Sequence, residues 1–209
     1  MESLINLFDF DETLILDNSS RVFERIAFES YSGRNKKLIR YFYFGRGKLL
    51  VSAANFISGK VTNNPIDRRL SFFINHVMKK VNSSVEDIAK RVADELRPNP
   101  LIESYQQNEI LVLSCGLDFV IESYFAKASI NGRVIFGSQI SRDGLNELLE
   151  ISLRSPPDKI VFLKELVPFR YLTDSKSEVR IIKRNLGKSF RLGATTSIDN
   201  KIFIVELHN

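Results

Sequence analysis

Acidic and hydroxyl side chains stand directly after three apolar stretches of this chain. Asp9 and Asp11 follow the apolar stretch 4–8, Ser114 follows 110–113, and Asp174 follows 169–173. Grouped carboxylates repel one another and cost free energy when they are buried without partners. We therefore expect a cation close to Asp9 and Asp11.

The residue types available restrict that cation to a hard metal ion. The chain has one cysteine, Cys115, and two distant histidines, so a zinc site and an internal disulfide are both excluded. Carboxylate oxygens suit Mg²⁺, which is usually bound by one or two carboxylates together with a phosphate oxygen. The sequence therefore predicts Mg²⁺ as cofactor and a phosphate ester as substrate.

The elements that must position these residues alternate between strands and helices. The patterns predict strands over 4–8, 109–114 and 169–173, and helices over 117–127, 158–167 and 177–186. Cys115 and Gly116 are predicted to form a tight turn between the second strand and its helix. This order favours an α/β fold with a mostly parallel sheet, in which ligands bind at the carboxyl ends of the strands.

The remaining segments have weaker patterns. Residues 18–105 show mainly helical spacing, with a helix start at Ser83 and Ser84 and a stop at Pro98. Asn131 and Gly132 predict a hairpin within 129–140. A further helix is predicted over 145–153, Gly187 as a helix cap, and closing strands over 189–192 and 202–207.

The length and the charge distribution indicate one domain with a basic middle segment. The 209 residues suit one domain of ordinary size or one domain carrying a large insertion, and the net charge is +5. Residues 17–103 hold 16 Lys and Arg against 9 Asp and Glu, which indicates a basic surface that attracts anions. No apolar run approaches the roughly 20 residues of a membrane span, and no secretory signal is evident. We expect a cytoplasmic protein with no membrane partner, and nucleic-acid binding is disfavoured.

Four motifs in order resemble the haloacid dehalogenase-like (HAD) superfamily. They are Asp9-Phe10-Asp11-Glu12-Thr13, Ser114 after an apolar strand, Lys159 at a helix start, and Asp174 to Glu178 after another strand. The helical insertion after the first motif and the Asn131-Gly132 hairpin predicted after the second are similar to the phosphoserine-phosphatase-like branch. The resemblance implies a Rossmann-like α/β core over 1–17 and 106–209, with an inserted helical cap of the C1 type over 18–105.

The resemblance also implies roles for the catalytic residues. Asp9 would attack phosphorus and form an aspartyl-phosphate. Asp11 would protonate the leaving oxygen and then activate water, while its backbone carbonyl binds the metal. Lys159 would offset the charge of the phosphate and of the nucleophile.

Binding roles follow from the same motifs. Ser114 and the backbone of Cys115 and Gly116 would bind phosphate. Phe10, Thr13 and Asn18 are the further candidate residues for binding the substrate, and Thr13 would also steady the catalytic loop. Asp9, Asp11, Asp174 and Glu178 form the predicted metal group, with Glu178 either supporting the metal waters or holding Lys159.

The substrate is predicted only as a class. True phosphoserine phosphatases have a glutamate where this chain has Asn18, so a small phosphorylated metabolite other than phosphoserine is expected. Arg21, Arg25, Arg46 and Lys48 are candidate cap cations. The alternatives to an Mg²⁺-dependent phosphatase are a phosphotransferase or phosphomutase of the same superfamily and a non-catalytic module that binds polyanions. The oligomeric state has no signal in the sequence.

Overall fold

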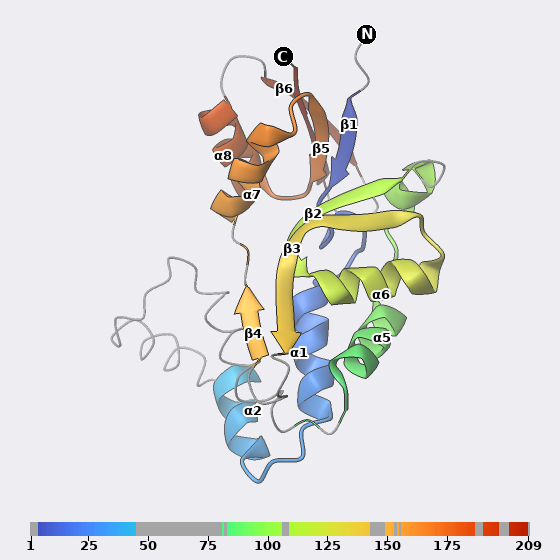
Figure 1. Cartoon of the computed structure of the whole chain (residues 1–209), viewed down its shortest axis with the longest axis vertical. Coiled ribbons are helices and arrows are strands. Elements are labelled where there is room, and N and C mark those ends of the chain that lie inside the picture. Colours follow the sequence, from blue (N-terminus) through green and yellow to red (C-terminus); the bar gives the residue numbers. More distant parts are fainter. Residues whose placement is uncertain are drawn as a thin grey trace, which may run out of the picture.

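One mixed sheet forms the centre of the molecule (Figure 1). The computed structural model describes residues 4–44, 81, 83–105, 109–142, 149–152, 154, 156–186, 190–196 and 201–208. Within these ranges seven strands pair in the order β4-β3-β2-β1-β5-β7-β6. The strands are β1 (Ile5–Phe8), β2 (Ile110–Leu117), β3 (Gly132–Arg142), β4 (Leu149–Ser152), β5 (Phe169–Thr173), β6 (Phe190–Thr196) and β7 (Lys201–Leu207).

Four neighbouring strands of this sheet are parallel. β1 lies between β2 and β5 and is parallel to both, and β3 is parallel to β2. β4 and β7 pair antiparallel at either side, and β6 pairs antiparallel with β7. The α/β class with a mostly parallel sheet is confirmed, and the carboxyl ends of β1, β2 and β5 meet at one edge.

Helices cover both faces of the sheet. They are α1 (Ser19–Glu29), α2 (Lys36–Phe44), α5 (Val85–Glu95), α6 (Asp118–Ala128), α7 (Pro156–Glu165) and α8 (Lys176–Leu186), with a 3-10 helix η2 (Pro100–Tyr105). Of the described helices, none is both long and apolar enough to span a bilayer.

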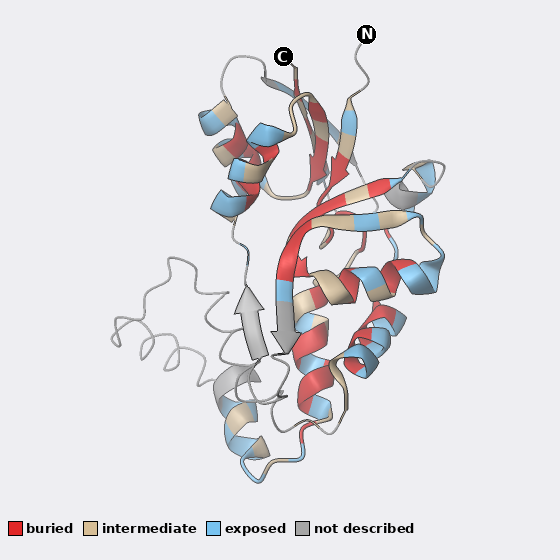
Figure 2. Ribbon diagram, viewed as in Figure 1, coloured by how far each residue is buried: buried red, intermediate tan, exposed pale blue. Residues whose placement is uncertain are grey.

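Each face of the sheet has its own hydrophobic cluster, and Figure 2 shows the buried residues on the inner sides of these helices. The α6 cluster, on the face covered by α1, α5 and α6, includes Phe8, Phe10, Ile110, Val112, Val120, Ile121 and Leu172. The α7 cluster, on the face covered by α7 and α8, includes Leu7, Leu113, Ile160, Leu163, Phe169, Tyr171, Val179 and Ile182. Successive strand residues thus alternate between the two clusters, as pleated strands require.

The two ends of the predicted insertion are held together. Arg97 donates to the Asp17 carboxylate from its backbone N–H and from its guanidinium, both at 2.8 Å. Next to this contact, Ile15 and Pro98 form an antiparallel bridge. The chain therefore leaves the core and returns to it at neighbouring points, as an inserted segment must.

The described helices of the insertion pack on the core. Buried residues of α1 and α5 belong to the same α6 cluster as β1, β2 and α6. Residues 45–80, the middle of the insertion, lie outside the described part of the chain. The division into a core and a cap stays a prediction.

The hairpin predicted at Asn131 and Gly132 is wrong. These residues join α6 to β3, which runs parallel to β2. α6 ends at Ser129 in the left-handed conformation. A Cβ at Gly132 would lie 2.7 Å from the Phe125 ring, so the glycine allows the strand to start close to the helix.

The helix predicted over 145–153 is also wrong for its described part, since β4 occupies Leu149–Ser152 and pairs with β3. A short apolar stretch does not distinguish helix from strand, and the free edge of β3 supplies backbone partners. Gly187 lies outside the described residues.

The turn predicted at Cys115 and Gly116 is wrong in a way that affects the site. β2 continues to Leu117, and α6 begins at Asp118. The β2–β3 pairing shifts register between Leu113 and Leu117. Ser114 therefore lies inside an irregular strand end instead of closing the strand.

The remaining predicted strands and helices of the core are confirmed, and their ends differ from the predicted ones by at most four residues. β5 has the predicted bounds.

Asn99 joins the returning end of the insertion to the loop that follows β1. Its fully buried side chain donates to the Thr13 carbonyl at 2.7 Å. We expect Asn99→Ala to lower the free energy of unfolding by about 1–3 kcal/mol, because the Thr13 carbonyl loses a buried donor. Urea denaturation measures this change.

The matched control is Asn185→Ala, which removes the same kind of amide-to-carbonyl bond from the exposed surface of α8. Its effect should stay within about 0.5 kcal/mol. Equal effects for the two variants would contradict the proposed contribution of Asn99.

Candidate active site

The pleat of the neighbouring strands β1 and β5 directs Asp9 and Thr173 toward α7 and α8. Asp9 lies two residues after Leu7, and Thr173 lies two residues after Tyr171. Leu7 and Tyr171 belong to the α7 cluster, so strand alternation directs Asp9 and Thr173 to the same face. The Asp9 N–H donates to the Leu172 carbonyl at 2.8 Å, which holds the first catalytic loop against the end of β5.

A buried lysine collects these groups. The Lys159 Nζ lies 3.2 Å from Asp9 Oδ1, 2.7 Å from Glu178 Oε1 and 2.9 Å from the Tyr171 hydroxyl. Its side chain is 1% exposed. The Tyr171 hydroxyl donates to Glu178 Oε2 at 2.8 Å, and the Thr173 hydroxyl lies 3.3 Å from Asp9 Oδ2. We call Asp9, Lys159, Tyr171, Thr173 and Glu178 the Lys159 network.

Two carboxylates share one ammonium group in this network, and the pKa values reflect that imbalance. Burial raises the pKa of Asp9 to about 7, although Lys159 opposes the shift and Glu178 and Asp11 add to it. Burial alone would lower the pKa of Lys159, but Asp9 and Glu178 raise it above its ordinary value. Lys159 is therefore charged, and Asp9 lies near the point of ionisation at neutral pH.

Asp11 lies at the N-terminus of α1. Its Oδ1 accepts the backbone N–H of Ser19 at 2.8 Å. Burial raises the pKa of Asp11, and the contact with Ser19 opposes that rise. A carboxyl group with a raised pKa, held in a fixed position, suits proton transfer.

Ser114 and Gly116 lie beside Asp11. The Gly116 N–H donates to Ser114 Oγ at 3.0 Å. A methyl carbon added to Gly116 would lie 3.2 Å from Ser114 Oγ and 3.6 Å from Asp11 Oδ2. The predicted phosphate-binding serine is therefore close to the predicted proton donor. Cys115, between the two, accepts a hydrogen bond from Ser138 Oγ at its carbonyl.

Asp174 is tied to the first catalytic loop. Its N–H donates to Thr13 Oγ1 at 3.1 Å, which matches the loop-steadying role predicted for Thr13. Burial, followed by the charge of Glu12, raises the pKa of Asp174 to about 6.

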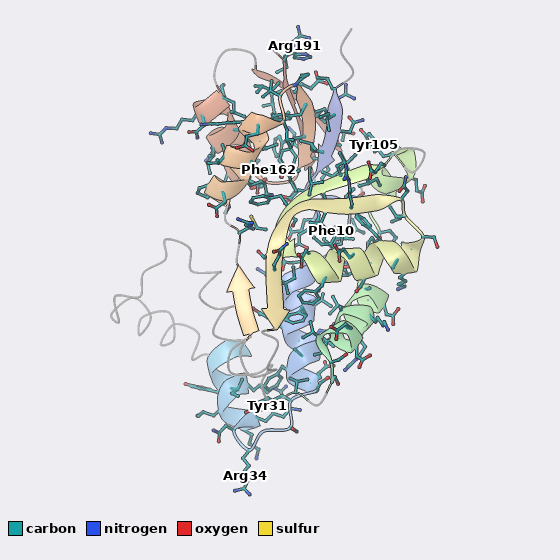
Figure 3. The ribbon with its side chains drawn as sticks, viewed as in Figure 1. Phe10, Tyr31, Arg34, Tyr105, Phe162 and Arg191 are labelled. Carbon is teal, nitrogen blue, oxygen red and sulfur yellow. The ribbon has the colours of Figure 1, made fainter. Side chains whose placement is uncertain are left out.

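Two predicted binding residues serve mainly the fold. The Phe10 ring packs edge-on against Tyr124 and Phe125 in the α6 cluster, where Figure 3 shows it beside α6. Its N–H donates to Asp9 Oδ1 at 2.9 Å, so its backbone alone reaches the site. Asn18 caps α1, since its side-chain oxygen accepts from Arg21 N–H.

The two candidate cap cations in the described part of the chain lie on the exposed surface of α1. Arg21 is exposed, and Arg25 forms ion pairs with Glu29 and Glu95 between α1 and α5. Arg46 and Lys48 lie outside the described residues.

The acidic residues fit a magnesium ion in part. Asp11, Glu178 and Asp174 each raise the pKa of Asp9, so all three lie within electrostatic reach of that carboxyl group. No three His, Cys, Asp or Glu side chains form a metal-binding group in the described ranges. Mg²⁺ needs only one or two carboxylates beside waters and phosphate, and Asp9 and Asp174 supply two. Both Glu178 oxygens are already hydrogen-bonded, so its geometry favours the role of holding Lys159.

Four residues at or beside the site were not predicted from the sequence. Tyr171 and Thr173 looked like ordinary strand residues, although their two-residue spacing puts them on the same face as Asp9. Ser19 and Asn99 carried no signal, because their contacts depend on where the insertion leaves and returns.

A separate cavity of about 400 Å³ lies between α6, β3 and α7. It is lined by Phe136, Phe162 and Arg154 among others and contains none of the predicted site residues.

No protein-family model matches the sequence, and no curated protein matches it. Several solved structures do. A HAD family hydrolase from Salmonella enterica serovar Typhi is 13% identical with a TM-score of 0.45, and the match covers 78% of this chain and 50% of that one. A phosphoserine phosphatase solved as a phospho-aspartyl intermediate analogue is also 13% identical with a TM-score of 0.45, covering 79% and 71%. A phosphoserine phosphohydrolase-like protein from Francisella tularensis is 16% identical with a TM-score of 0.42, covering 88% and 83%.

These neighbours bear the names of the superfamily and the branch that the motifs of this chain resemble. The chain spans half the length of the Salmonella protein. At identities of 13–16% and TM-scores below 0.5, these similarities assign no activity. The geometry of the Lys159 network supports the functional proposal instead.

Removing the shared cation should strongly destabilise the fold. Lys159→Met leaves Asp9 and Glu178 buried without a counter-charge, and we expect the free energy of unfolding at pH 7.5 to fall by about 3–5 kcal/mol. The loss should be smaller at pH 5, where Asp9 can take up a proton. Lys164→Met, on the exposed side of the same helix, is the control and should change stability by less than about 0.5 kcal/mol. Similar losses for both variants would show that Lys159 carries no special charge balance.

Asp9 itself should limit stability at high pH. Because the pKa of Asp9 is raised in the fold, the stability it contributes is present below pH 4 and is lost as the pH rises through about 7. We expect Asp9→Asn to be more stable than the wild type at pH 8, with the difference shrinking toward pH 5. Urea denaturation in metal-free buffer measures both values. A variant less stable than the wild type at pH 8 would contradict the raised pKa.

Proposed function

We propose that this protein is a phosphomonoester hydrolase that works through an aspartyl-phosphate on Asp9. One observation supports this most strongly: Asp9 ends a central parallel strand, pairs with the buried Lys159, and is followed two residues later by the anchored Asp11. A carboxylate nucleophile, a fixed positive charge and a proton donor are the groups that phosphoryl transfer through an acyl phosphate requires.

The first step makes the covalent intermediate. An Asp9 carboxylate oxygen attacks phosphorus, the bond between phosphorus and the ester oxygen breaks, and Asp11 donates its proton to the leaving oxygen. The product is an alcohol and an aspartyl-phosphate. The raised pKa of Asp11 favours its protonated form at the start of this step.

The second step restores the enzyme. Asp11, now ionised, takes a proton from a water molecule that attacks phosphorus, and the bond between phosphorus and the Asp9 oxygen breaks. Inorganic phosphate leaves, and Asp9 returns as a carboxylate. Lys159 stays charged throughout and offsets the negative charge on Asp9 and the phosphoryl group.

Mg²⁺ is the proposed cofactor, bound by the Asp9 and Asp174 carboxylates and the Asp11 backbone carbonyl, and it would neutralise charge on the phosphoryl oxygens. Ser114 and the backbone of Cys115 and Gly116 are the proposed phosphate contacts.

The proposed substrate is a small phosphorylated metabolite other than phosphoserine. Position 18 carries a neutral side chain whose oxygen is already used to cap α1, so it offers no carboxylate for a substrate amine. A cytoplasmic location is part of the same proposal.

Hydrolysis of an aryl phosphate tests the function. We expect release of inorganic phosphate that requires Mg²⁺ and stops with a chelator. Asp9→Asn should lower kcat by at least about 10³-fold because the nucleophile is lost. Asp11→Asn should lower kcat by about 10²–10⁴-fold because proton transfer is lost.

Asp94→Asn is the control, since this carboxylate is exposed on α5 and pairs with Lys127 away from the site. It should leave the rate unchanged. Full activity of Asp9→Asn, with its fold intact, would rule out Asp9 as the nucleophile.

A further inference from the structure

Ser19 has a buried hydroxyl beside the proposed site. The residue is 1% exposed, and its Oγ makes no hydrogen bond of acceptable geometry to the described part of the chain. Its backbone N–H is separately used by Asp11 Oδ1. A buried hydroxyl left unpaired costs free energy, so a position that tolerates one calls for an explanation.

The hydroxyl faces a small space lined by oxygen atoms. A methyl carbon added to Gly116 would lie 3.4 Å from Ser19 Oγ, 3.2 Å from Ser114 Oγ and 3.6 Å from Asp11 Oδ2. Ser19 Oγ therefore lies around the same small space as Oγ of the proposed phosphate-binding serine and Oδ2 of the proposed proton donor. A glycine at 116 keeps this space open.

The helix that carries Ser19 also favours an anion there. Ser19 is the first residue of α1, an 11-residue helix whose N-terminus is directed at Asp11. Helix N-termini stabilise negative charge through their free N–H groups and the helix dipole. The unpaired hydroxyl adds a directed donor to that end.

We propose that Ser19 is a second phosphate-binding residue, whose hydroxyl donates to a phosphoryl oxygen of the substrate beside Ser114. The assignment rests on the proposed function for the identity of the ligand, a phosphate monoester or inorganic phosphate. Position 19 belongs neither to the four motifs that resemble the HAD superfamily nor to the end of a strand. The insertion thus contributes a phosphate contact through its first helical residue.

A role confined to the protein is the competing explanation. The Ser19 side chain is close enough to Asp11 to oppose the rise in the Asp11 pKa, so the hydroxyl could turn to Asp11 alone. The two roles differ in their effect on phosphate binding, because a hydroxyl that serves only Asp11 contributes nothing to the affinity for phosphate.

Calorimetric titration with inorganic phosphate in Mg²⁺ buffer distinguishes a phosphate-binding role of Ser19 from a role confined to Asp11. We expect Ser19→Ala to weaken phosphate binding about tenfold, since it removes a hydrogen bond to a charged ligand. Ser19→Cys, with a similar volume and a weaker donor, should also weaken it. Ser114→Ala is the positive control. Ser123→Ala is the negative control, because this hydroxyl donates to the Phe119 carbonyl within α6.

Folding should be unaffected in Ser19→Ala. Asn18 still caps α1, and the backbone N–H at position 19 still reaches Asp11. Thermal unfolding checks that the midpoint of the variant does not fall.

Unchanged phosphate affinity in Ser19→Ala would overturn the inference, including the case in which only the pH profile of hydrolysis moves. A wild-type protein that binds no phosphate would overturn it as well. Phosphate binding that depends on Ser19, without hydrolysis of any phosphate ester, would support the inference while the proposed function fails.

Discussion

The buried ammonium group of Lys159 is the interaction on which the rest of the site depends. It contacts Asp9, Glu178 and Tyr171 at once, and its side chain is almost fully removed from solvent. Isolated ions are costly to bury, so the lysine and the two carboxylates require one another. Burial raises the pKa of Asp9 to about 7, and the excess of negative charge left by two carboxylates around one ammonium group adds to that rise. Binding of a further cation would offset this excess of negative charge.

The fold brings this network together from three parts of the chain. β1 and β5 are neighbours, so Asp9 and Thr173 lie side by side, while α7 and α8 bring Lys159 and Glu178 to the same face. Asp11 is held by α1 at the start of the insertion, and it remains within electrostatic reach of Asp9 and Lys159. This arrangement concentrates unfavourable charge at one edge of the sheet, a common cost of catalytic sites.

The sequence predicted the parts of the site that depend on strand ends. An apolar stretch followed by Asp9 or Asp174 shows where a buried strand stops, and β1 and β5 lie where those patterns indicated. The pattern failed where tertiary contacts overrode local preference. Gly132 is needed for packing against Phe125 and not for a hairpin. The irregular end of β2 depends on pairing with β3, which no local pattern around Ser114 could show.

The partners of the proposed catalytic residues were harder to predict than the residues themselves. Tyr171 and Ser19 resemble ordinary strand and helix residues, and their roles depend on which side chains face them from other elements. Asn99 acts on Thr13 across 86 positions of sequence. Such contacts follow from how the inserted segment returns to the core, and a single sequence contains no record of that path.

The most direct test is peptide mapping by mass spectrometry after a turnover mixture of protein, Mg²⁺ and aryl phosphate is quenched in acid. We expect one phosphoryl group on the peptide that contains Asp9, bound as an acyl phosphate that hydroxylamine removes. A phosphoryl group on Ser114 or another residue, or sustained turnover with none on Asp9 under any quench, would contradict the proposal that this carboxylate is the nucleophile.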